Sequence, residues 1–435
     1  MAITPPAAAP QRMPGDDVRR LRRAVRELSV LNELASEIGA SLDSEHITST
    51  IIRRSLRAVH GEQGVITLID RPGGRTDART LVRTMTGKSM GQALHVEESL
   101  VGWMLLNKKP LLVDSPHEDE RFSGVRWDES VRSILCVPLL VKSELTGILT
   151  IFNKIGAAAF NEDDQRLLSI VAAQSAQVID NARLYEEEET LRRMREEVRL
   201  ATEIQQGLLP KRDPVVSGYT IAGASVPAEA VGGDYFDFIR VDDDRLAVCL
   251  ADVSGKGLSA ALLMANLQAT IRAQALARRD PTACLKYSNA LLCQSTDAHK
   301  FATCFYAVLE TDRHVVRYSN AGHDPPLLVT DGEPPARLET GGIVLGFLES
   351  LEYGEAEIAM GPGDVLVIYS DGVTEAVDDN DEPFGEERLG SIIEDERGSS
   401  AGQVLDRIFD AVRDHAGERG QADDITVVVV RRDAS

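Results

Sequence analysis

The fold follows from the stretch RLAVCLADVSGKG at residues 245–257, whose pattern returns in VLVIYSDG at residues 365–372. Each stretch begins as an apolar strand and ends with an aspartate, Asp252 or Asp371, beside a glycine-containing turn. An aspartate at the end of a buried strand costs free energy unless its carboxylate is paired or bound to a cation. Both stretches therefore predict sheet strands that bring cation ligands to an edge of the sheet.

Acidic residues cluster at four places in the second half of the chain. Besides these two strand ends, VGGDYFD spans residues 231–237 and ADDIT spans residues 422–426. One Asp-Gly after a strand is usually a turn or a helix cap, but four such clusters indicate a shared site. Converging carboxylates with little His or Cys nearby favour Mg²⁺ or Mn²⁺ over zinc. Two such ions can activate water and hold a phosphoryl group for in-line attack.

The overall composition excludes several classes of protein. The 435 residues include 47 Lys and Arg against 69 Asp and Glu, a net charge of −22, which argues against nucleic acid or an anionic membrane as the main partner. No apolar run approaches the ~20 residues that a membrane helix needs. The Pro- and Ala-rich start lacks the pattern of a secretory signal and is typical of a disordered arm. Five cysteines without a CxxC pair favour a cytoplasmic protein.

The first half of the chain predicts one α+β domain with an antiparallel sheet. A short heptad pattern between Leu21 and Ile38 precedes it. Apolar periodicity predicts helices at 45–60 and 100–107 and strands at 64–70, 80–85, 111–114, 133–141 and 147–153.

A closing helix begins near Glu162 and continues into the charged stretch that Pro210 ends. Leu184, Leu191 and Val198 are seven residues apart in it. Two interpretations stay open, a solvated linker helix and a parallel coiled coil that transmits rotation between domains.

The second half predicts stacked sheets flanked by helices. Strands are expected at 219–225, 245–252, 301–310, 314–320, 327–329, 355–360, 365–369 and 425–431, and helices at 257–277, 280–296, 386–394 and 400–415. Strand clusters interrupted by a helix pair are typical of layered sheets rather than of a parallel βαβ array.

The motifs of this half resemble a known family. In chain order they are GGDYFD, ADVSGKG, NAGH at 320–323, SDGVTE at 370–375 and DDIT. They are similar to the SpoIIE/RsbU-type branch of the metal-dependent PPM (type 2C) serine/threonine phosphatases, over about residues 200–432. The resemblance implies an αββα β-sandwich with two Mn²⁺ or Mg²⁺ ions at one edge.

The resemblance also assigns roles to residues. It implies Asp234 and Asp252 as bridging or near-bridging ligands, Asp371 as a ligand of the first ion, and the backbone oxygen of Val253 as a ligand of the second. Asp423 is the expected ligand of the last cluster. Asp424 is the alternative there, and Asp237 is expected outside the direct ligands because it lies three residues beyond Asp234.

One departure concerns phosphate binding. Eukaryotic-type members carry an arginine shortly before the first metal aspartate, where this chain has Pro-Ala-Glu-Ala at residues 227–230. Phosphate binding is therefore expected to depend on the ions, with Lys256 and the loop of His323 as candidates. For His323, a hydrogen bond that orders the loop is an equally good interpretation.

The first half is similar to a GAF sensor domain. Asn153-Lys154 followed by Phe160 and Asp164 resembles a signature of cyclic-nucleotide-binding GAF domains, with Gln165 in place of the final glutamate. The resemblance implies that Lys154 pairs with Asp164 and braces the pocket. The ligand stays open between a cyclic nucleotide, another small molecule and none, and a domain used only for dimerisation is the alternative.

Together these patterns predict a multidomain α+β protein. We divide it into a disordered arm at 1–20, a GAF domain at 21–183, a coiled-coil-like linker helix at 184–210 and a phosphatase domain at 211–435. The expected function is dephosphorylation of a phosphoprotein, which the resemblance implies to be a STAS-type anti-sigma-factor antagonist. The GAF domain of a homodimer is expected to gate it through the helix end that contains Gln205, Leu208, Leu209 and Pro210.

Two other functions are alternatives to the phosphatase. A diguanylate cyclase is suggested by Gly-Gly-Asp-Tyr-Phe, but the cyclase turn needs Glu at the position of Tyr235 and leaves the later motifs without a role. The second is a GAF-dimer scaffold whose phosphatase domain is inactive, which four retained acidic clusters disfavour.

Overall fold

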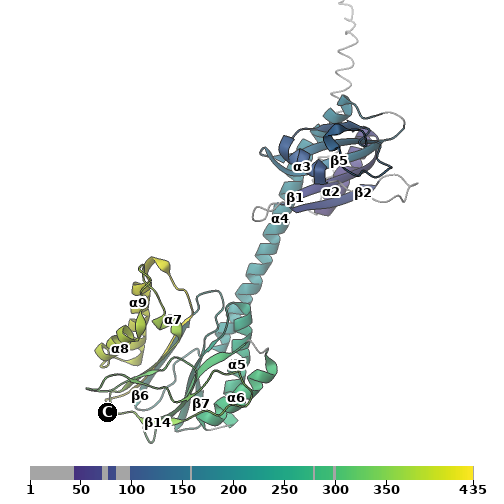
Figure 1. The fold of residues 1–435 in the computed structure, drawn as a ribbon. Coiled ribbons are helices and arrows are strands. Elements are labelled where there is room, and N and C mark those ends of the chain that lie inside the picture. The colour runs from purple at the N-terminus through teal and green to yellow at the C-terminus, as the bar shows by residue number, and fades with distance from the viewer. Residues whose placement is uncertain are drawn as a thin grey trace, which may run out of the picture. The chain divides into compact units, whose positions relative to one another are not determined.

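The computed structural model describes residues 44–70, 77–84, 98–156, 159–277, 280–296 and 300–434 (Figure 1). The predicted arm at 1–20 and the heptad pattern at 21–38 lie outside these residues. The chain forms two compact units that meet between Arg192 and Arg193, inside the helix α4 (Glu162–Leu208). Among the described residues, no helix combines the length and apolar character needed to cross a bilayer.

The first unit contains one five-stranded antiparallel sheet with the order β2-β1-β5-β4-β3. Its strands are β1 (Gly61–Asp70), β2 (Asp77–Thr84), β3 (Leu111–Asp114), β4 (Ser133–Val141) and β5 (Glu144–Lys154). Its helices are α2 (Ser44–Val59), α3 (Glu98–Asn107) and the first part of α4, with a short 3-10 turn at Glu120–Phe122.

Helices cover both faces of this sheet, and strands β1, β4 and β5 have apolar side chains on both of their faces. On one face, Leu135 and Leu149 pack with Ile51 of α2 and Leu168 of α4. On the other face, the neighbours of these strand residues pack against Leu100 of α3. The predicted α+β arrangement of this half is thus the observed one, with strand ends within a few residues of the expected positions.

The second unit is a sandwich of two sheets. One sheet has the order β13-β10-β9-β8-β7, with β14 also pairing with β10, and the other has the order β12-β11-β15-β16-β6. Strands of the first are β7 (Tyr235–Arg240), β8 (Arg245–Val253), β9 (Ala302–Glu310), β10 (Val315–Ala321), β13 (Gly341–Gly342) and β14 (Ala356–Ala359). Strands of the second are β6 (Tyr219–Val226), β11 (Leu327–Val329), β12 (Ala336–Arg337), β15 (Val365–Tyr369) and β16 (Ile425–Arg432).

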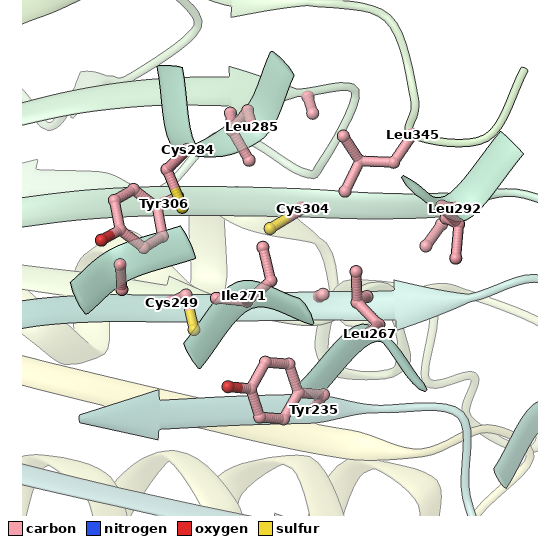
Figure 2. Close-up of a cluster of buried hydrophobic side chains, with 14 of the residues drawn as sticks. Tyr235, Cys249, Leu267, Ile271, Cys284, Leu285, Leu292, Cys304, Tyr306 and Leu345 are labelled. Atoms are coloured by element: carbon pink, nitrogen blue, oxygen red, sulfur yellow. The ribbon is translucent and has the colours of Figure 1, made fainter. Parts of the chain in front are cut away.

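Helix pairs cover the outer faces of the sandwich. Its helices are α5 (Leu258–Ala277), α6 (Pro281–Ser295), the single turn α7 (Asp371–Thr374), α8 (Gly385–Asp395) and α9 (Ala401–Ala416). Figure 2 shows the core that α5 and α6 form with the first sheet, where Cys249, Cys284 and Cys304 pack as apolar side chains beside Tyr306. The helices α8 and α9 pack on the second sheet. This αββα order is the one predicted from the sequence.

Strand β16 shows how the sequence produces these layers. In its run of valines, Val427 and Val429 pack toward α8 and α9, whereas Val428 and Val430 pack into the core between the sheets. A strand buried on both faces needs such a continuous apolar run, because successive side chains point to opposite faces. Strand β7 is absent from the sequence prediction, in which VGGDYFD appears only as an acidic cluster.

Candidate metal centre

Side-chain alternation brings three aspartates to the space between the sheets. In β8, Leu246, Val248 and Leu250 face the inter-sheet core, and Asp252 continues the same series at the strand end. Asp234 precedes Phe236 of that core by two residues, as Asp424 precedes Thr426, which in turn precedes Val428. Because side chains repeat every two residues along a strand, these carboxylates belong to one interior face. The sandwich therefore brings together acidic residues just before β7, at the end of β8 and just before β16.

Asp424 holds the Gly-Gly turn before Asp234 in place. Its carboxylate accepts hydrogen bonds from the backbone N–H groups of Ala228 at 2.8 Å, Gly233 at 2.6 Å and Asp234 at 3.4 Å. Its carbonyl accepts from the Ser370 hydroxyl at 3.2 Å, so it also ties this turn to the end of β15. With its carboxylate bonded to backbone amides, Asp424 orients the site, and this leaves Asp423 as the freer member of the pair.

Glycines allow this close approach of three segments. A Cβ atom at Gly232 would collide with the Asp424 carboxylate, and one at Gly372 would collide with the Asp424 carbonyl. A Cβ at Gly233 would lie 2.9 Å from the carbonyl oxygen of Val253 and 3.3 Å from Oδ1 of Asp252. The Val253 carbonyl, expected to be a ligand, thus faces the turn that carries Asp234.

The carboxylates raise one another's pKa. Burial, then the charges of Asp371, Asp423 and Asp424, raise the pKa of Asp252 to about 7. Burial, then the charge of Asp423, raise the pKa of Asp371 to about 6. Burial and the nearby Asp252 raise the pKa of Asp234 well above its ordinary value. Such mutual repulsion favours binding of protons or of cations.

The chemistry of this donor set fits hard divalent cations. Oδ2 of Asp234 is buried without a hydrogen-bond partner. A bound divalent cation would satisfy this carboxylate oxygen. Within the described ranges, no three His, Cys, Asp or Glu side chains already stand in a metal-holding arrangement. The oxygen donors come from separate segments of the chain.

Lys256 lies at the exposed side of the same edge. Its Nζ atom is 3.0 Å from Oδ2 of Asp423 and donates to the Ala422 carbonyl at 3.0 Å. The ammonium group of Lys256 therefore forms an ion pair with Asp423, the carboxylate that is expected to bind an ion. Lys256 and Asp423 are about half exposed, at 56% and 49% of their side chains, so this pair can open at little cost.

Asp237 does not join the other carboxylates. It is fully buried and accepts from Arg272 of α5 at 2.5 and 2.9 Å, from the Tyr235 hydroxyl at 2.8 Å and from the Phe238 N–H at 2.8 Å. Being an odd number of residues from Asp234, it faces α5 on the outer side of the sheet. Asp237 is thus outside the direct ligands, as expected, and its carboxylate pairs with Arg272 of α5, a partner that the sequence pattern does not indicate.

His323 lies in the interior and not in the cleft. Its Nδ1 is 2.8 Å from the Thr303 hydroxyl, and Thr303 pairs in register with Asp252. Its backbone N–H donates to Asn320 at 2.7 Å, which is the loop-ordering role that the sequence left open. Burial lowers the pKa of His323 to about 4, against the opposing effect of the Tyr369 backbone. A buried neutral imidazole at 5% exposure does not support the substrate-loop role.

The end of α4 contacts the Gly-Gly turn directly. Gln205 is buried, donates from Nε2 to the Gly232 carbonyl at 2.6 Å, and accepts from the Gly232 N–H at 3.0 Å. Thr202, one turn earlier, donates to the Ala230 carbonyl at 2.7 Å. Leu208 accepts from Gln268 of α5 at 3.4 Å, and Leu209 packs on the sandwich cores. The helix end therefore binds the segment that delivers Asp234.

The GAF-type residues of the first unit form a local network around the end of β5. Asn153 has a φ of 55°, accepts from the Arg132 N–H at 2.7 Å and donates to the Ser130 carbonyl at 2.8 Å. Lys154 forms an ion pair with Asp164 and lies 5.9 Å from the ring centroid of Phe160. These contacts brace the junction between β5 and α4.

Comparison with known proteins matches both units to families. The family model described as Stage II sporulation protein E (SpoIIE) matches residues 242–433, and the GAF domain model matches residues 41–180. Asp252, Asp371 and Asp423 lie inside the first match, whereas Asp234 lies just before it.

Two curated relatives align with the second half of the chain. Phosphoserine phosphatase RsbU of Bacillus subtilis is 33% identical over 254 residues, which cover 57% of this chain and 75% of RsbU. Phosphoserine phosphatase RsbP of the same organism is 23% identical over 239 residues, covering 54% of this chain and 57% of RsbP.

Among solved structures, the SiaA-PP2C domain of Pseudomonas aeruginosa is similar with a TM-score of 0.50 and 21% identity, covering 56% of this chain and 99% of that domain. At this identity the similarity concerns the fold, which is the PP2C-type sandwich.

Proposed function

Because the chain belongs to the RsbU-type family of phosphoserine phosphatases and carries a GAF domain, we propose that it removes phosphate from phosphoserine or phosphothreonine of a protein in a metal-dependent reaction. The observation that carries this proposal is the convergence of Asp234, Asp252 and Asp371 at one sandwich edge, with pKa values raised by burial and by their neighbours. Several carboxylates that repel one another at one place favour binding of divalent cations, so we assign them as metal ligands rather than as nucleophiles.

Five groups of this chain would hold the ions, namely the carboxylates of Asp234, Asp252, Asp371 and Asp423 and the carbonyl oxygen of Val253. Two bound Mn²⁺ or Mg²⁺ ions supply activation of water and neutralisation of charge on the phosphoryl oxygens. Asp424 keeps the Gly-Gly turn, and with it Asp234, in register through its three backbone hydrogen bonds. The aspartates act as ligands, so no phosphoenzyme forms.

If Asp423 holds an ion, its carboxylate would no longer be available to Lys256. The ammonium group of Lys256 would then be free to bind a phosphoryl oxygen as a point charge. This gives the chain a cationic phosphate contact in the absence of the arginine found in eukaryotic-type members.

Regulation is proposed to act through α4. Gln205 and Thr202 bind the backbone of the turn before Asp234, so a shift of the helix end moves a ligand of the ions. The GAF domain is at the other end of the same continuous helix. We infer that a signal there alters the affinity for the ions and thereby the activity, with the GAF ligand left open.

A parallel homodimer would cover an apolar seam on α4. The heptad residues Leu184, Leu191 and Val198 are 45–52% exposed in the single chain, and Met194 between them is 56% exposed. Pairing of this seam in a second copy would bury them as in a coiled coil. A cytoplasmic location agrees with four of the five cysteines being buried as apolar side chains with unreactive thiols.

The proposed substrate is a phosphorylated STAS-type anti-sigma-factor antagonist. The test is release of phosphate from such a protein with Mn²⁺, compared with excess EDTA and with the Asp252→Asn and Asp371→Asn variants. We expect activity only with metal and with both aspartates present. Retained activity in either variant or in EDTA would refute the scheme, and no activity at all would favour the scaffold alternative.

A cyclase function has no support in the fold. Tyr235 occupies the position where the cyclase turn needs glutamate, and it is fully buried in the core under α5 (Figure 2). Incubation with GTP is expected to yield no cyclic dinucleotide.

A further inference from the structure

A second, larger cavity adjoins the candidate metal centre. It has a volume of about 610 Å³ and lies where α7, the C-terminal half of α9 and the segment at residues 417–422 meet. Volumes of this size are typical of sites that bind small molecules or side chains. None of the roles assigned above uses it.

The walls of this cavity are mainly apolar. Val377, Phe409, Val412 and Ala416 line it, and Val412 and Ala416 are themselves buried. The arginines at its rim already have partners, since Arg413 pairs with Asp410 and Arg419 with Asp381. An apolar group therefore fits the interior better than a charged one does.

The cavity is continuous with the cleft of the metal centre. Lys256 and Asp423 line both the cavity and the smaller cleft that contains Gly233 and Asp252. Gly372, next to Asp371, also lines the cavity. A group in the cavity and a phosphoryl group at the carboxylate edge are therefore separated only by this shared pair of residues, and one substrate molecule can fill both.

We propose that this cavity binds an apolar side chain located close to the phosphoserine in the sequence of the protein substrate. The inference rests on the proposed phosphatase function and adds the substrate feature that it selects. The ions recognise any phosphate ester, so they cannot distinguish one phosphoprotein from another. A neighbouring apolar pocket supplies that distinction, because burying a larger apolar side chain there strengthens binding of the correct segment.

The test uses the full chain with Mn²⁺ and synthetic phosphoserine peptides. The peptides are otherwise Gly and Ala and carry Ala, Leu or Phe at one of the three positions on either side of phosphoserine. We expect kcat/KM to rise about tenfold or more from Ala to Leu at one of these positions. In Ala416→Leu and Val377→Phe, which fill the cavity, the preference is expected to fall within about twofold while the all-Ala peptide is hydrolysed as before.

The matched control is Ala269→Leu, which adds the same side chain at an exposed position of α5 and is expected to keep the preference. Equal rates for all peptides in the unmodified protein would overturn the proposal and leave the phosphatase function standing. An undiminished preference in both folded filling variants would also overturn it. Hydrolysis of no peptide and no phosphoprotein would instead contradict the phosphatase function itself.

Discussion

Removing Arg272 is expected to destabilise the second unit and leave its metal affinity nearly unchanged. The Arg272→Ala variant strands the carboxylate of Asp237, which is fully buried and would keep only its bonds from Tyr235 and Phe238. Breaking a buried pair costs about 3–5 kcal/mol. Because the Arg272 side chain is 48% exposed, water can partly replace it, and we expect about 2–3 kcal/mol.

A loss of this size corresponds to a fall in melting temperature of roughly 4–12 °C for a unit of this length. The assay is scanning calorimetry of the full chain, following the transition that Mn²⁺ shifts, together with a Mn²⁺ titration. Lys286→Ala is the control, since it breaks an exposed pair with Glu352 and should cost less than about 1 kcal/mol. In the double variant Arg272→Ala/Asp237→Ala, part of the loss should be recovered because no buried charge remains.

An unchanged melting temperature in Arg272→Ala would refute the reasoning about this pair. The position of Asp237 on the outer face of the sheet, away from the metal ligands, can be tested separately. If Asp237→Asn abolished Mn²⁺ binding with little change in stability, Asp237 would be a ligand, contrary to its position on the outer face of the sheet.

Three further outcomes follow from the metal centre. Gln205→Ala loses both hydrogen bonds to Gly232, at a cost of about 1–3 kcal/mol, and should weaken Mn²⁺ binding in a titration. The control Gln206→Ala, at the exposed neighbouring position, should bind Mn²⁺ as the unmodified protein does. Equal Mn²⁺ affinities of the two variants would contradict the proposed role of the helix end. The folded pKa of Asp252 is raised from 3.8 to about 7 and that of Asp371 from 3.8 to about 6, so their contribution to stability is fully present below pH 3.8 and is lost as the pH rises through 6 to 7. The melting temperature in EDTA should therefore fall between pH 5 and pH 8. The increase in melting temperature on adding Mn²⁺ should be larger at pH 8 than at pH 6, because protons compete with the ion for the carboxylates. The opposite trend would count against converging carboxylates. Asp252→Asn removes the charge repulsion between Asp252 and the neighbouring carboxylates. In EDTA at pH 8 this variant should melt a few degrees higher than the unmodified protein, but its melting temperature should no longer rise with Mn²⁺. A retained rise with Mn²⁺ would exclude Asp252 as a ligand.

Much of the layered architecture was predictable because strand and helix patterns are local. The valine run of β16 and the apolar run of β8 are continuous, which is expected of strands buried on both faces. Strand β7 was missed because its six residues combine aromatic side chains with Asp237, and an aspartate inside a short strand hides its apolar period. The alternation of side chains was nevertheless available there, and it would have separated Asp237 from Asp234.

By itself the sequence determined which residues carry acidic side chains at strand ends, which turns have the glycines for close approach, and that a long helix precedes the sandwich. Periodicity and turn chemistry depend on neighbours along the chain, so one sequence is sufficient for them. Only the tertiary structure decided the partners across long separations: Asp424 on the turn before Asp234, Arg272 on Asp237, Thr303 on His323, and Gln205 on Gly232. Such pairs form where sheet register and packing bring distant segments within hydrogen-bond distance, and no local pattern encodes which donor meets which acceptor.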